Sequence, residues 1–392
     1  MKYFFALGNN PTLSVAELSA VLHFKNMILS KNILIADTDE INASELIKRF
    51  GGTIKIGEVI EENTDRNKLL ESILKIITPA TEGKYKFGLS YYGDKKFNDK
   101  PIGMEIKKFL KEQGISCRWV ISKEKVLSSV VVEQNKLTGK GDEIVLIENG
   151  KNIFIGKTLA VQPFKELSFR DYGRPGRDDE SGMLPPKLAQ IMINLTKTRD
   201  SIKDITLLDP FCGSGTVLTE SILVGYQNLI GSDLSAKAVN DTKTNIEWIK
   251  DTYRFTIPPY ELINESATTI SKKIKSNSID AIVTEPFLGP QRGHLDIRKV
   301  TQDLELLYNQ ALQEFKKILK KDGVIVMLWP VFMTGRQPQP INPDISDFKI
   351  INPIPGILMN NQVINLTDRD TIIYGREGQR VWREIVVLKI AK

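Results

Sequence analysis

The stretch LLDPFCGSGTVLTES, residues 207–221, decides the fold that the chain is expected to adopt. It begins with the last residues of an apolar strand that ends in an acid, Asp209, and it closes with the first turns of an apolar helix. Between them lie Gly213 and Gly215, which lack a Cβ and therefore allow a tight turn and a close approach of the backbone to a ligand. Because α/β sheets bind cofactors at the carboxyl ends of parallel strands, we predict a cofactor-binding turn here.

The residues of this turn indicate which kind of cofactor to expect. A phosphate-binding loop needs Gly-Lys-Ser/Thr at the start of the helix, and the turn contains no lysine. A dinucleotide fingerprint, G-x-G-x-x-G, needs a third glycine where this chain has Leu218. Asp209 can instead face a positive group, a sulfonium or an α-ammonium. A second predicted strand, NLIGSD, ends at Asp233, about 20 residues after Gly213, where an acid can bind both hydroxyls of a ribose.

A third strand end indicates the chemistry. The segment SIDAIVTEPFLGP, residues 278–290, is an apolar strand that runs into Glu285, Pro286 and Phe287. The amine of a nucleobase is a poor nucleophile because its lone pair is delocalised into the ring. The carboxylate of Glu285 and a carbonyl before or at Pro286 can accept hydrogen bonds from the N–H groups, and an aromatic ring can stack on a flipped base. This segment therefore predicts methyl transfer to the amino group of a base.

Three segments give the chain a resemblance to a known family of enzymes. Residues 209–216, DPFCGSGT, resemble motif I of the class I S-adenosylmethionine-dependent methyltransferases, and residues 284–289, TEPFLG, resemble their motif IV, usually Asp/Asn-Pro-Pro-Tyr/Phe. Residues 181–196, SGMLPPKLAQIMINLT, resemble the element before motif I in the archaeal and eukaryotic tRNA guanine-N2 methyltransferases of the Trm11 and Trm-G10 type. Enzymes of that type carry an N-terminal ferredoxin-like unit and a THUMP domain. The resemblance implies S-adenosyl-L-methionine as the cofactor.

The same resemblance implies a set of site residues. Those expected in catalysis are Glu285, Pro286 and Phe287. Those expected to bind the cofactor are Asp209, Phe211, Gly213, Gly215, Thr216, Asp233, Leu234, Glu265, Ser266 and Ala267. Ser266 stands where the family often has an acid that contacts adenine, and Glu265 beside it is expected to substitute. The Asp-Pro-Pro-Tyr of the family becomes Glu-Pro-Phe-Leu in this chain, with an acid one methylene longer and the aromatic residue one place early.

Cysteine and histidine usage argues against other kinds of site. The chain has 2 cysteines and 2 histidines, too few for a disulfide framework or for a zinc site built on either residue. No metal is therefore expected. Cys212 lies in the cofactor turn, but motif IV has no cysteine, so we expect a packed side chain there rather than a nucleophile.

The order of predicted elements divides the chain into four parts. Residues 1–62 have the order β-α-β-α-β and suggest a ferredoxin-like unit. Residues 63–161, which include a hairpin predicted at an Asn-Gly pair, are expected to form a THUMP-like RNA-binding domain. Residues 162–186 have no hydrophobic period and cluster proline, glycine and charge, which is typical of a linker. In residues 187–392 strands and helices alternate, which predicts an α/β fold: a Rossmann-like methyltransferase domain with a mostly parallel seven-stranded sheet and a C-terminal antiparallel hairpin.

Composition and charge limit the location and the partners. The chain of 392 residues is 41% hydrophobic and 26% charged, as in soluble globular proteins, and no window approaches 20 consecutive apolar residues. Its apolar start, MKYFFAL, is too short for a signal peptide, so the cytoplasm is expected. The net charge of +6 permits an acidic partner such as nucleic acid without requiring one. Lys84, Lys86, Lys95 and Lys96 are equally compatible with RNA binding and with a solvated edge.

Three functions are compatible with these features. The one we expect is methylation of an exocyclic amine of a nucleobase in RNA, foremost guanine N2 in tRNA. The second is a DNA amino-methyltransferase acting on adenine N6 or cytosine N4, which has the same two motifs. The third is an RNA-binding protein with a degenerate catalytic motif, which the altered motif IV favours. For the first function we expect a monomeric protein that binds tRNA and does not bind a membrane. The resemblance also allows a small activating protein subunit.

Overall fold

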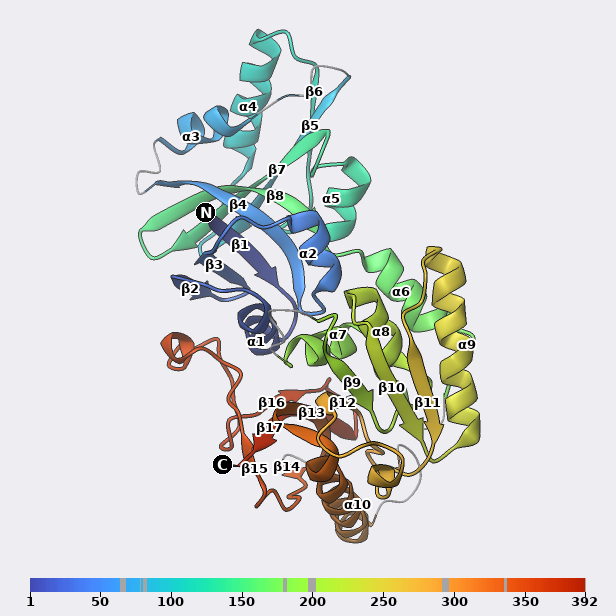
Figure 1. Cartoon of the computed structure of the whole chain (residues 1–392). Coiled ribbons are helices and arrows are strands. Elements are labelled where there is room, and N and C mark those ends of the chain that lie inside the picture. The colour runs from blue at the N-terminus through green and yellow to red at the C-terminus, as the bar shows by residue number, and fades with distance from the viewer. Residues whose placement is uncertain are drawn as a thin grey trace. The chain divides into compact units, whose positions relative to one another are not determined.

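The structure is a computed structural model that describes the chain apart from residues 64–67, 78, 80–82, 179–181, 197–201, 291–295, 335–336 and 392. The described residues form two compact units, each built on one β-sheet (Figure 1). The first unit contains Met1–Val15, Leu22–Phe164 and Ile357–Val363, and the second contains Ala16–Val21, Lys165–Gly356 and Ile364–Lys392. None of the helices within the described ranges is long and apolar enough to cross a membrane.

The sheet of the first unit has eight strands in the order β2-β3-β1-β4-β8-β7-β5-β6. Its strands are β1 (Lys2–Leu7), β2 (Met27–Ser30), β3 (Ile33–Asp37), β4 (Thr53–Asn63), β5 (Tyr85–Tyr92), β6 (Cys117–Val120), β7 (Gly141–Asn149) and β8 (Asn152–Val161). The helices between these strands are α1 (Pro11–Val21), α2 (Ala43–Arg49), α3 (Leu69–Ile76), α4 (Lys100–Glu112) and α5 (Ser129–Asn135). Strand β5 runs parallel to both of its neighbours, β6 and β7, and the other pairs are antiparallel.

The first part of this sheet has one strand more than the sequence pattern indicated. The observed order is β1-α1-β2-β3-α2-β4 with β2-β3-β1-β4 as antiparallel neighbours, the arrangement of a split βαβ unit. Strand β2 was missed because its four residues, MILS, are too few to show a period. Helix α1 has Pro11 as its first residue. Asn10 caps the helix, because its Oδ1 accepts from the amide of Leu13 at 3.1 Å.

Strands β7 and β8 form the hairpin predicted at Asn149-Gly150. Asn149 pairs with Asn152, and Gly150 has a φ of 64°, in the left-handed region that glycine adopts without strain. Strand β8 also pairs with β4, so the predicted ferredoxin-like unit and the predicted THUMP-like domain share one continuous sheet. The boundary between residues 62 and 63 stays a prediction, and it falls at the end of β4.

A buried ion pair joins strands in the middle of this sheet. Lys55 Nζ donates to Glu143 Oε1 at 2.5 Å, and the two side chains are 1% and 0% exposed. The Lys55 ammonium also donates to the carbonyl of Leu127 at 2.6 Å, while Glu143 accepts from the hydroxyls of Ser90 and Thr158. Because further hydrogen bonds support both charges, removal of one partner would leave an uncompensated buried charge.

The sheet of the second unit is parallel from β11 to β13 and antiparallel beyond β13. Seven strands follow the continuous order β11-β10-β9-β12-β13-β17-β15, while β14 pairs with β13 and β16 with β17. The strands are β9 (Thr206–Asp209), β10 (Asn228–Asp233), β11 (Tyr260–Asn264), β12 (Ile279–Thr284), β13 (Leu319–Thr334), β14 (Gln337–Pro340), β15 (Phe348–Ile350), β16 (Ile372–Tyr374) and β17 (Val381–Ile390). The parallel order from β11 to β13 and the antiparallel hairpin of β16 and β17 confirm the predicted fold class, and two short strands, β14 and β16, lie beside the seven.

Helices accompany the parallel strands, and Figure 1 shows β9, β10 and β11 side by side with α9 next to β11. The helices are α6 (Phe164–Tyr172), α7 (Pro186–Asn194), α8 (Thr216–Val224), α9 (Ala236–Tyr253) and α10 (Ile297–Ile318), with short 3₁₀ turns at Ile270–Lys272 and Gly356–Leu358. The central strands β9 and β12 are buried, as apolar strands covered on both faces should be. The chain order reverses between β9 and β12, the position at which α/β sheets bind ligands.

The predicted linker is partly helical. Of residues 162–186, which were predicted to form a linker, Phe164–Tyr172 form helix α6. The sequence shows no hydrophobic period here because one of the buried positions of the helix holds an arginine in place of an apolar residue. Arg170 is 6% exposed, and its Nε and Nη2 donate to Glu220 at 2.7 and 3.0 Å. A bidentate pair of this kind anchors the segment against helix α8 as an apolar side chain would.

A second departure concerns the C-terminal part. Residues 357–363 lie inside the range predicted for the methyltransferase domain, 187–392, but pack with the first unit. Within that unit Asn361 Nδ2 donates to the carbonyl of Leu29 at 3.0 Å. The sequence of this segment has no hydrophobic period that would assign it to either unit.

Candidate active site

The carboxyl ends of β9, β10 and β12 open into a cavity of about 520 Å³, within the ~300–1,000 Å³ range of small-molecule sites. All residues expected in the site line this cavity except Gly215 and Glu265. Three stretches far apart in the sequence therefore meet as the predicted sheet order requires. The roles of the individual residues follow from their contacts.

The turn after β9 is built around Asp209, which is 2% exposed. Its Oδ1 accepts from the Thr284 hydroxyl at 2.7 Å and from the Phe211 amide at 3.2 Å. Both glycines of the turn are left-handed, with φ of 52° at Gly213 and 81° at Gly215. A Cβ on Gly215 would lie 2.8 Å from the side chain of a helix α9 residue, whereas a Cβ on Gly213 would meet the Phe211 carbonyl oxygen at an ordinary contact distance of 4.0 Å. Gly215 therefore allows close helix packing, and Gly213 leaves room at the cavity.

Burial dominates the electrostatics of Asp209. It raises the pKa of this carboxyl to about 7, the charges of Asp233 and Glu285 add to the rise, and the hydrogen bonds from Thr284 and Phe211 oppose it. Among the described residues no lysine or arginine forms an ion pair with Asp209 or Asp233. Asp209 is thus a buried acid of the cavity that has no counter-charge among the described residues, which suits a cationic ligand.

Asp233 closes strand β10 and fixes the shape of the turn. Its Oδ2 accepts from the Gly213 amide at 3.0 Å, and its Oδ1 accepts from the Ser235 amide at 2.9 Å. A carboxylate has about four acceptor positions, so the two oxygens keep capacity for hydroxyl donors. The next residue, Leu234, is 76% exposed and forms part of the rim.

The loop after β11 contributes Ser266 and Ala267 but not Glu265. The Glu265 Oε1 accepts from the Ser266 amide at 3.0 Å and from the Thr269 hydroxyl at 2.7 Å. These bonds hold its carboxylate over the following turn, outside the cavity lining. Glu265 is thus not among the residues that line the cavity, and its expected contact with an adenine stays a prediction.

The loop after β12 places Glu285, Pro286 and Phe287 at the cavity. Phe287 is 50% exposed, and its carbonyl accepts from the hydroxyl of Tyr308 at 3.0 Å. Tyr308 is fully buried on α10, and burial raises the pKa of this phenol. Tyr308 thereby stays a neutral donor that fixes the backbone behind the exposed ring.

Glu285 is paired with a cation that the sequence analysis missed. Arg383 Nε donates to Glu285 Oε1 at 2.5 Å, and the two side chains are 15% and 14% exposed. Arg383 lies on β17 and also lines the cavity. In the sequence Arg383 is one of three charged residues in the strand VWREIVVLKI, and no local pattern indicates that it belongs to the site.

Cys212 is a packed side chain. It is 4% exposed, and burial, reinforced by the charge of Asp209, raises the pKa of its thiol well above the ordinary value. The thiol is thus neutral at physiological pH, and only a thiolate would act as a nucleophile. The burial of Cys212 agrees with the expectation of a packed side chain, and its lack of a nucleophilic role stays a prediction.

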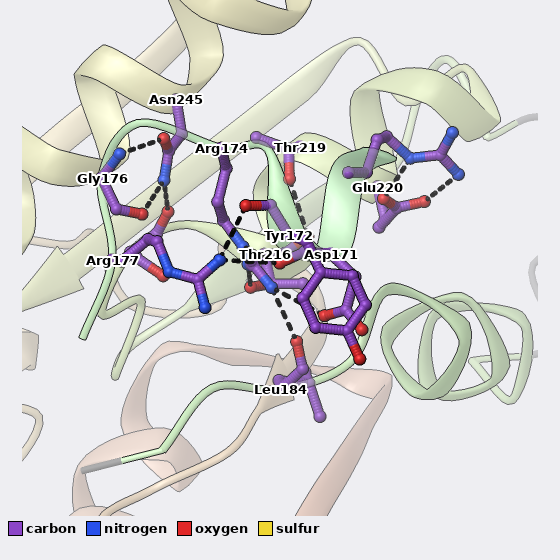
Figure 2. Close-up of polar contacts among 12 residues, drawn as sticks. Asp171, Tyr172, Arg174, Gly176, Arg177, Leu184, Thr216, Thr219, Glu220 and Asn245 are labelled. Atoms are coloured by element: carbon purple, nitrogen blue, oxygen red, sulfur yellow. Dashed lines mark hydrogen bonds and ion pairs between the residues drawn. The ribbon is translucent and has the colours of Figure 1, made fainter. Parts of the chain in front are cut away.

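The segment between α6 and α7 is tied to the start of helix α8, as Figure 2 shows. Arg174 is 5% exposed, and its Nη1 donates to the hydroxyl of Thr216, the first residue of α8. Its Nη2 donates to the carbonyl of Leu184 and to Asp171 Oδ1, at 3.5 and 3.4 Å. The guanidinium therefore holds the preceding segment against a residue that lines the cavity.

Asn245 of α9 makes a second connection in the same region (Figure 2). Its Oδ1 accepts from the Gly176 amide at 2.8 Å, and its Nδ2 donates to the carbonyls of Gly176 and Ser214 at 2.9 and 2.7 Å. The side chain is 1% exposed. One amide thus joins three backbone groups, including one in the turn after β9.

Comparisons with known proteins agree with this geometry. Residues 174–334 match the UPF0020 family model, described as RMKL-like, methyltransferase domain. A probable tRNA (guanine(10)-N2)-dimethyltransferase from Methanothermococcus thermolithotrophicus is 32% identical over 143 residues, which cover 36% of this chain and 77% of that protein. The chain belongs to the tRNA (guanine(10)-N2)-dimethyltransferase family. The tRNA (guanine(10)-N2)-dimethyltransferase of Pyrococcus abyssi is 23% identical over 340 residues, 84% of this chain and 88% of its own.

A solved structure shares the fold of the whole chain. The crystal structure of TrmN from Thermus thermophilus aligns over 100% of both chains with a TM-score of 0.57 and 16% identity. The second unit is thus a methyltransferase domain of class I fold, as motifs I and IV predicted. All the residues expected in the site fall within the matched range 174–334, whereas Arg383 lies beyond it.

Proposed function

We propose that this protein transfers a methyl group from S-adenosyl-L-methionine to an exocyclic amine of a nucleobase in tRNA, foremost guanine N2. The observation that carries the proposal is the meeting of Asp209, Asp233 and Glu285 around one cavity at three strand ends. Membership of the tRNA (guanine(10)-N2)-dimethyltransferase family supports the guanine amine as the target.

The cavity wall fits the cofactor. When bound, S-adenosyl-L-methionine supplies an electrophilic methyl group on a sulfonium. Asp209 offers a buried carboxylate to positive charge, and Asp233 keeps acceptor capacity for the two hydroxyls of a ribose. Gly213, which has a left-handed φ and no side chain, leaves the backbone accessible at the cavity, and Thr216, Ser266 and Ala267 complete the wall.

The residues after β12 would prepare the target amine. The Glu285 carboxylate and the carbonyl before or at Pro286 accept hydrogen bonds from the amine N–H groups, which localises the nitrogen lone pair. The half-exposed ring of Phe287 offers a face on which a flipped base can stack. Tyr308 restrains this ring by holding the Phe287 carbonyl.

The two alternatives are less well supported. A DNA amino-methyltransferase would use the same cavity, but the relatives named above are described as acting on tRNA. A degenerate RNA-binding protein would be expected to lose the motif IV acid from the site. Here Glu285 still lines the cavity despite its longer side chain.

The first unit is proposed to bind RNA as a ferredoxin-like and a THUMP-like part, with Lys84, Lys86, Lys95 and Lys96 as candidates for phosphate contacts. We propose that the protein is a cytoplasmic monomer. A small activating protein subunit is an addition that the family resemblance allows.

Label transfer tests the proposal. Protein incubated with methyl-labelled S-adenosylmethionine should label transcribed tRNA and leave duplex DNA unlabelled. The Glu285→Gln variant serves as the control for background, and it should lose activity by about 100-fold or more because the charged acceptor is gone. Label in DNA alone would support the DNA enzyme, and label in neither substrate would support the non-catalytic protein.

A further inference from the structure

The strongest feature outside the predicted site is the cation that reaches Glu285. Five acids line the cavity, Asp178, Asp209, Asp233, Asp241 and Glu285. Of the three at the strand ends, Asp209, Asp233 and Glu285, the one that forms an ion pair with a cation of the described residues is Glu285, and its partner is Arg383. Lys237 also lines the cavity, but it donates to Asp241 at 2.6 Å and is 75% exposed. The contact of Arg383 is therefore selective for the motif IV acid.

The order of the sheet explains how Arg383 reaches the site. Strand β13 lies between β12, which leads into Glu285, and β17, which carries Arg383. In the β13–β17 pair Arg383 is opposite Pro330, near the carboxyl end of β13. The long side chain of Arg383 can thus reach across β13 to Glu285, which follows β12.

The ion pair with Arg383 restrains Glu285, whose side chain is longer than the aspartate usual in motif IV. Glutamate has one more rotatable bond than the aspartate usual in motif IV, so more conformational freedom must be lost before its carboxylate is aimed at a substrate. The Arg383 Nε holds Oε1 and fixes the end of the side chain. Within the described part of the chain, Arg383 is the hydrogen-bond partner of the Glu285 carboxylate, and it binds Oε1. The other oxygen, Oε2, can therefore accept from another donor.

We propose that Arg383 is a positioning residue of the methyl-transfer reaction: it holds Glu285 by Oε1 so that Oε2 can accept the N–H of the target amine. The inference rests on the proposed function. Arg383 touches neither the cofactor nor the reacting nitrogen in this scheme and acts through Glu285. The pair thereby compensates for the Glu-Pro-Phe form of motif IV.

The test uses the full chain with tRNA. Arg383→Met should lower kcat by about 100-fold, the cost of a reacting group misplaced by an ångström, while the KM for tRNA and the Kd for S-adenosylmethionine stay within about twofold. Arg383→Ala should regain activity when millimolar guanidinium is added, because the free cation can occupy the space of the side chain. Lys389→Met removes the same charge from the same strand and should keep wild-type activity.

Coupling to Glu285 is the second readout. The double variant Glu285→Gln with Arg383→Met should be no slower than Glu285→Gln alone, since the arginine acts only through the acid. Full activity in Arg383→Met would overturn the inference, and so would a gain of activity, which would mean that the pair blocks the acid. Additive losses, or a loss of Tm without guanidinium rescue, would also overturn it. If the wild-type enzyme labels no tRNA while binding the cofactor, the proposed function has failed instead.

Discussion

Replacing Asp209 by asparagine should make the ligand-free protein more stable at alkaline pH and worse at binding its cofactor. The reason is the burial of this carboxyl, which raises its pKa from 3.8 to about 7. An unfolded chain ionises the group near pH 4, whereas the folded protein keeps the proton up to about pH 7. Between these values the folded state binds more protons, so its stability falls as the pH rises.

The structure gives the size of this effect. A rise from 3.8 to about 7 is roughly three pH units, and at ~1.4 kcal/mol per unit it corresponds to about 4 kcal/mol of lost stability at pH 8. Asparagine removes the charge but keeps an oxygen that can accept from Thr284 and Phe211. Asp209→Asn should therefore recover much of that free energy of unfolding at pH 8 and almost none at pH 4.

Urea denaturation of the ligand-free protein at several pH values between 4 and 8 measures this difference. The exposed Asp303 on α10 provides a matched control, because Asp303→Asn makes the same chemical change in solvent and should leave the pH dependence unaltered. Calorimetry should show that Asp209→Asn weakens S-adenosylmethionine binding by about 1–3 kcal/mol. A variant less stable than wild type at pH 8, or changed equally at every pH, would refute the reasoning.

Three further predictions test other parts of the molecule. Lys55→Met leaves Glu143 buried without its cation and should cost about 3–5 kcal/mol of stability by denaturant titration; a loss below 1 kcal/mol would contradict the burial of the pair. Asn245→Ala removes three hydrogen bonds from backbone groups beside the cofactor turn, and should weaken cofactor binding in calorimetry by about 1–3 kcal/mol; unchanged affinity would show that the turn holds its shape without it. Charge reversal at Lys95 and Lys96 should reduce tRNA affinity most at low salt and leave cofactor binding intact, whereas equal tRNA affinity at every salt concentration would remove these residues from the RNA surface.

The sequence predicted the parts of the site that are local in the chain. Motif I, the acid at the end of β10 and the Glu-Pro-Phe segment each follow an apolar strand, and parallel strands end at the same edge of the sheet. Their meeting at one cavity could therefore be expected before the structure was known. The fold class and the hairpin of β7 and β8 followed from alternation and turn chemistry in the same way.

Other features depend on positions far apart in the chain. Arg383 reaches Glu285 only because β17 inserts beside β13, and a single arginine in an apolar strand gives no sign of that. Arg170 and Arg174 are buried anchors of a segment that has no apolar period, so it was expected to be a linker. Glu265 was expected in the site because it stands beside Ser266, and the sequence did not indicate that its carboxylate accepts a hydrogen bond from Thr269.

The most direct measurement is the identity of the nucleoside that receives the methyl group. Transcribed tRNA should be incubated with the protein and labelled S-adenosylmethionine, digested to nucleosides and separated by chromatography with mass detection. The account predicts label in N2-methylguanosine or N2,N2-dimethylguanosine from the wild-type enzyme, and its near absence with Glu285→Gln. Label in any other nucleoside, or undiminished label with the variant, would contradict the assignment of the guanine amine and of the acid that accepts from it.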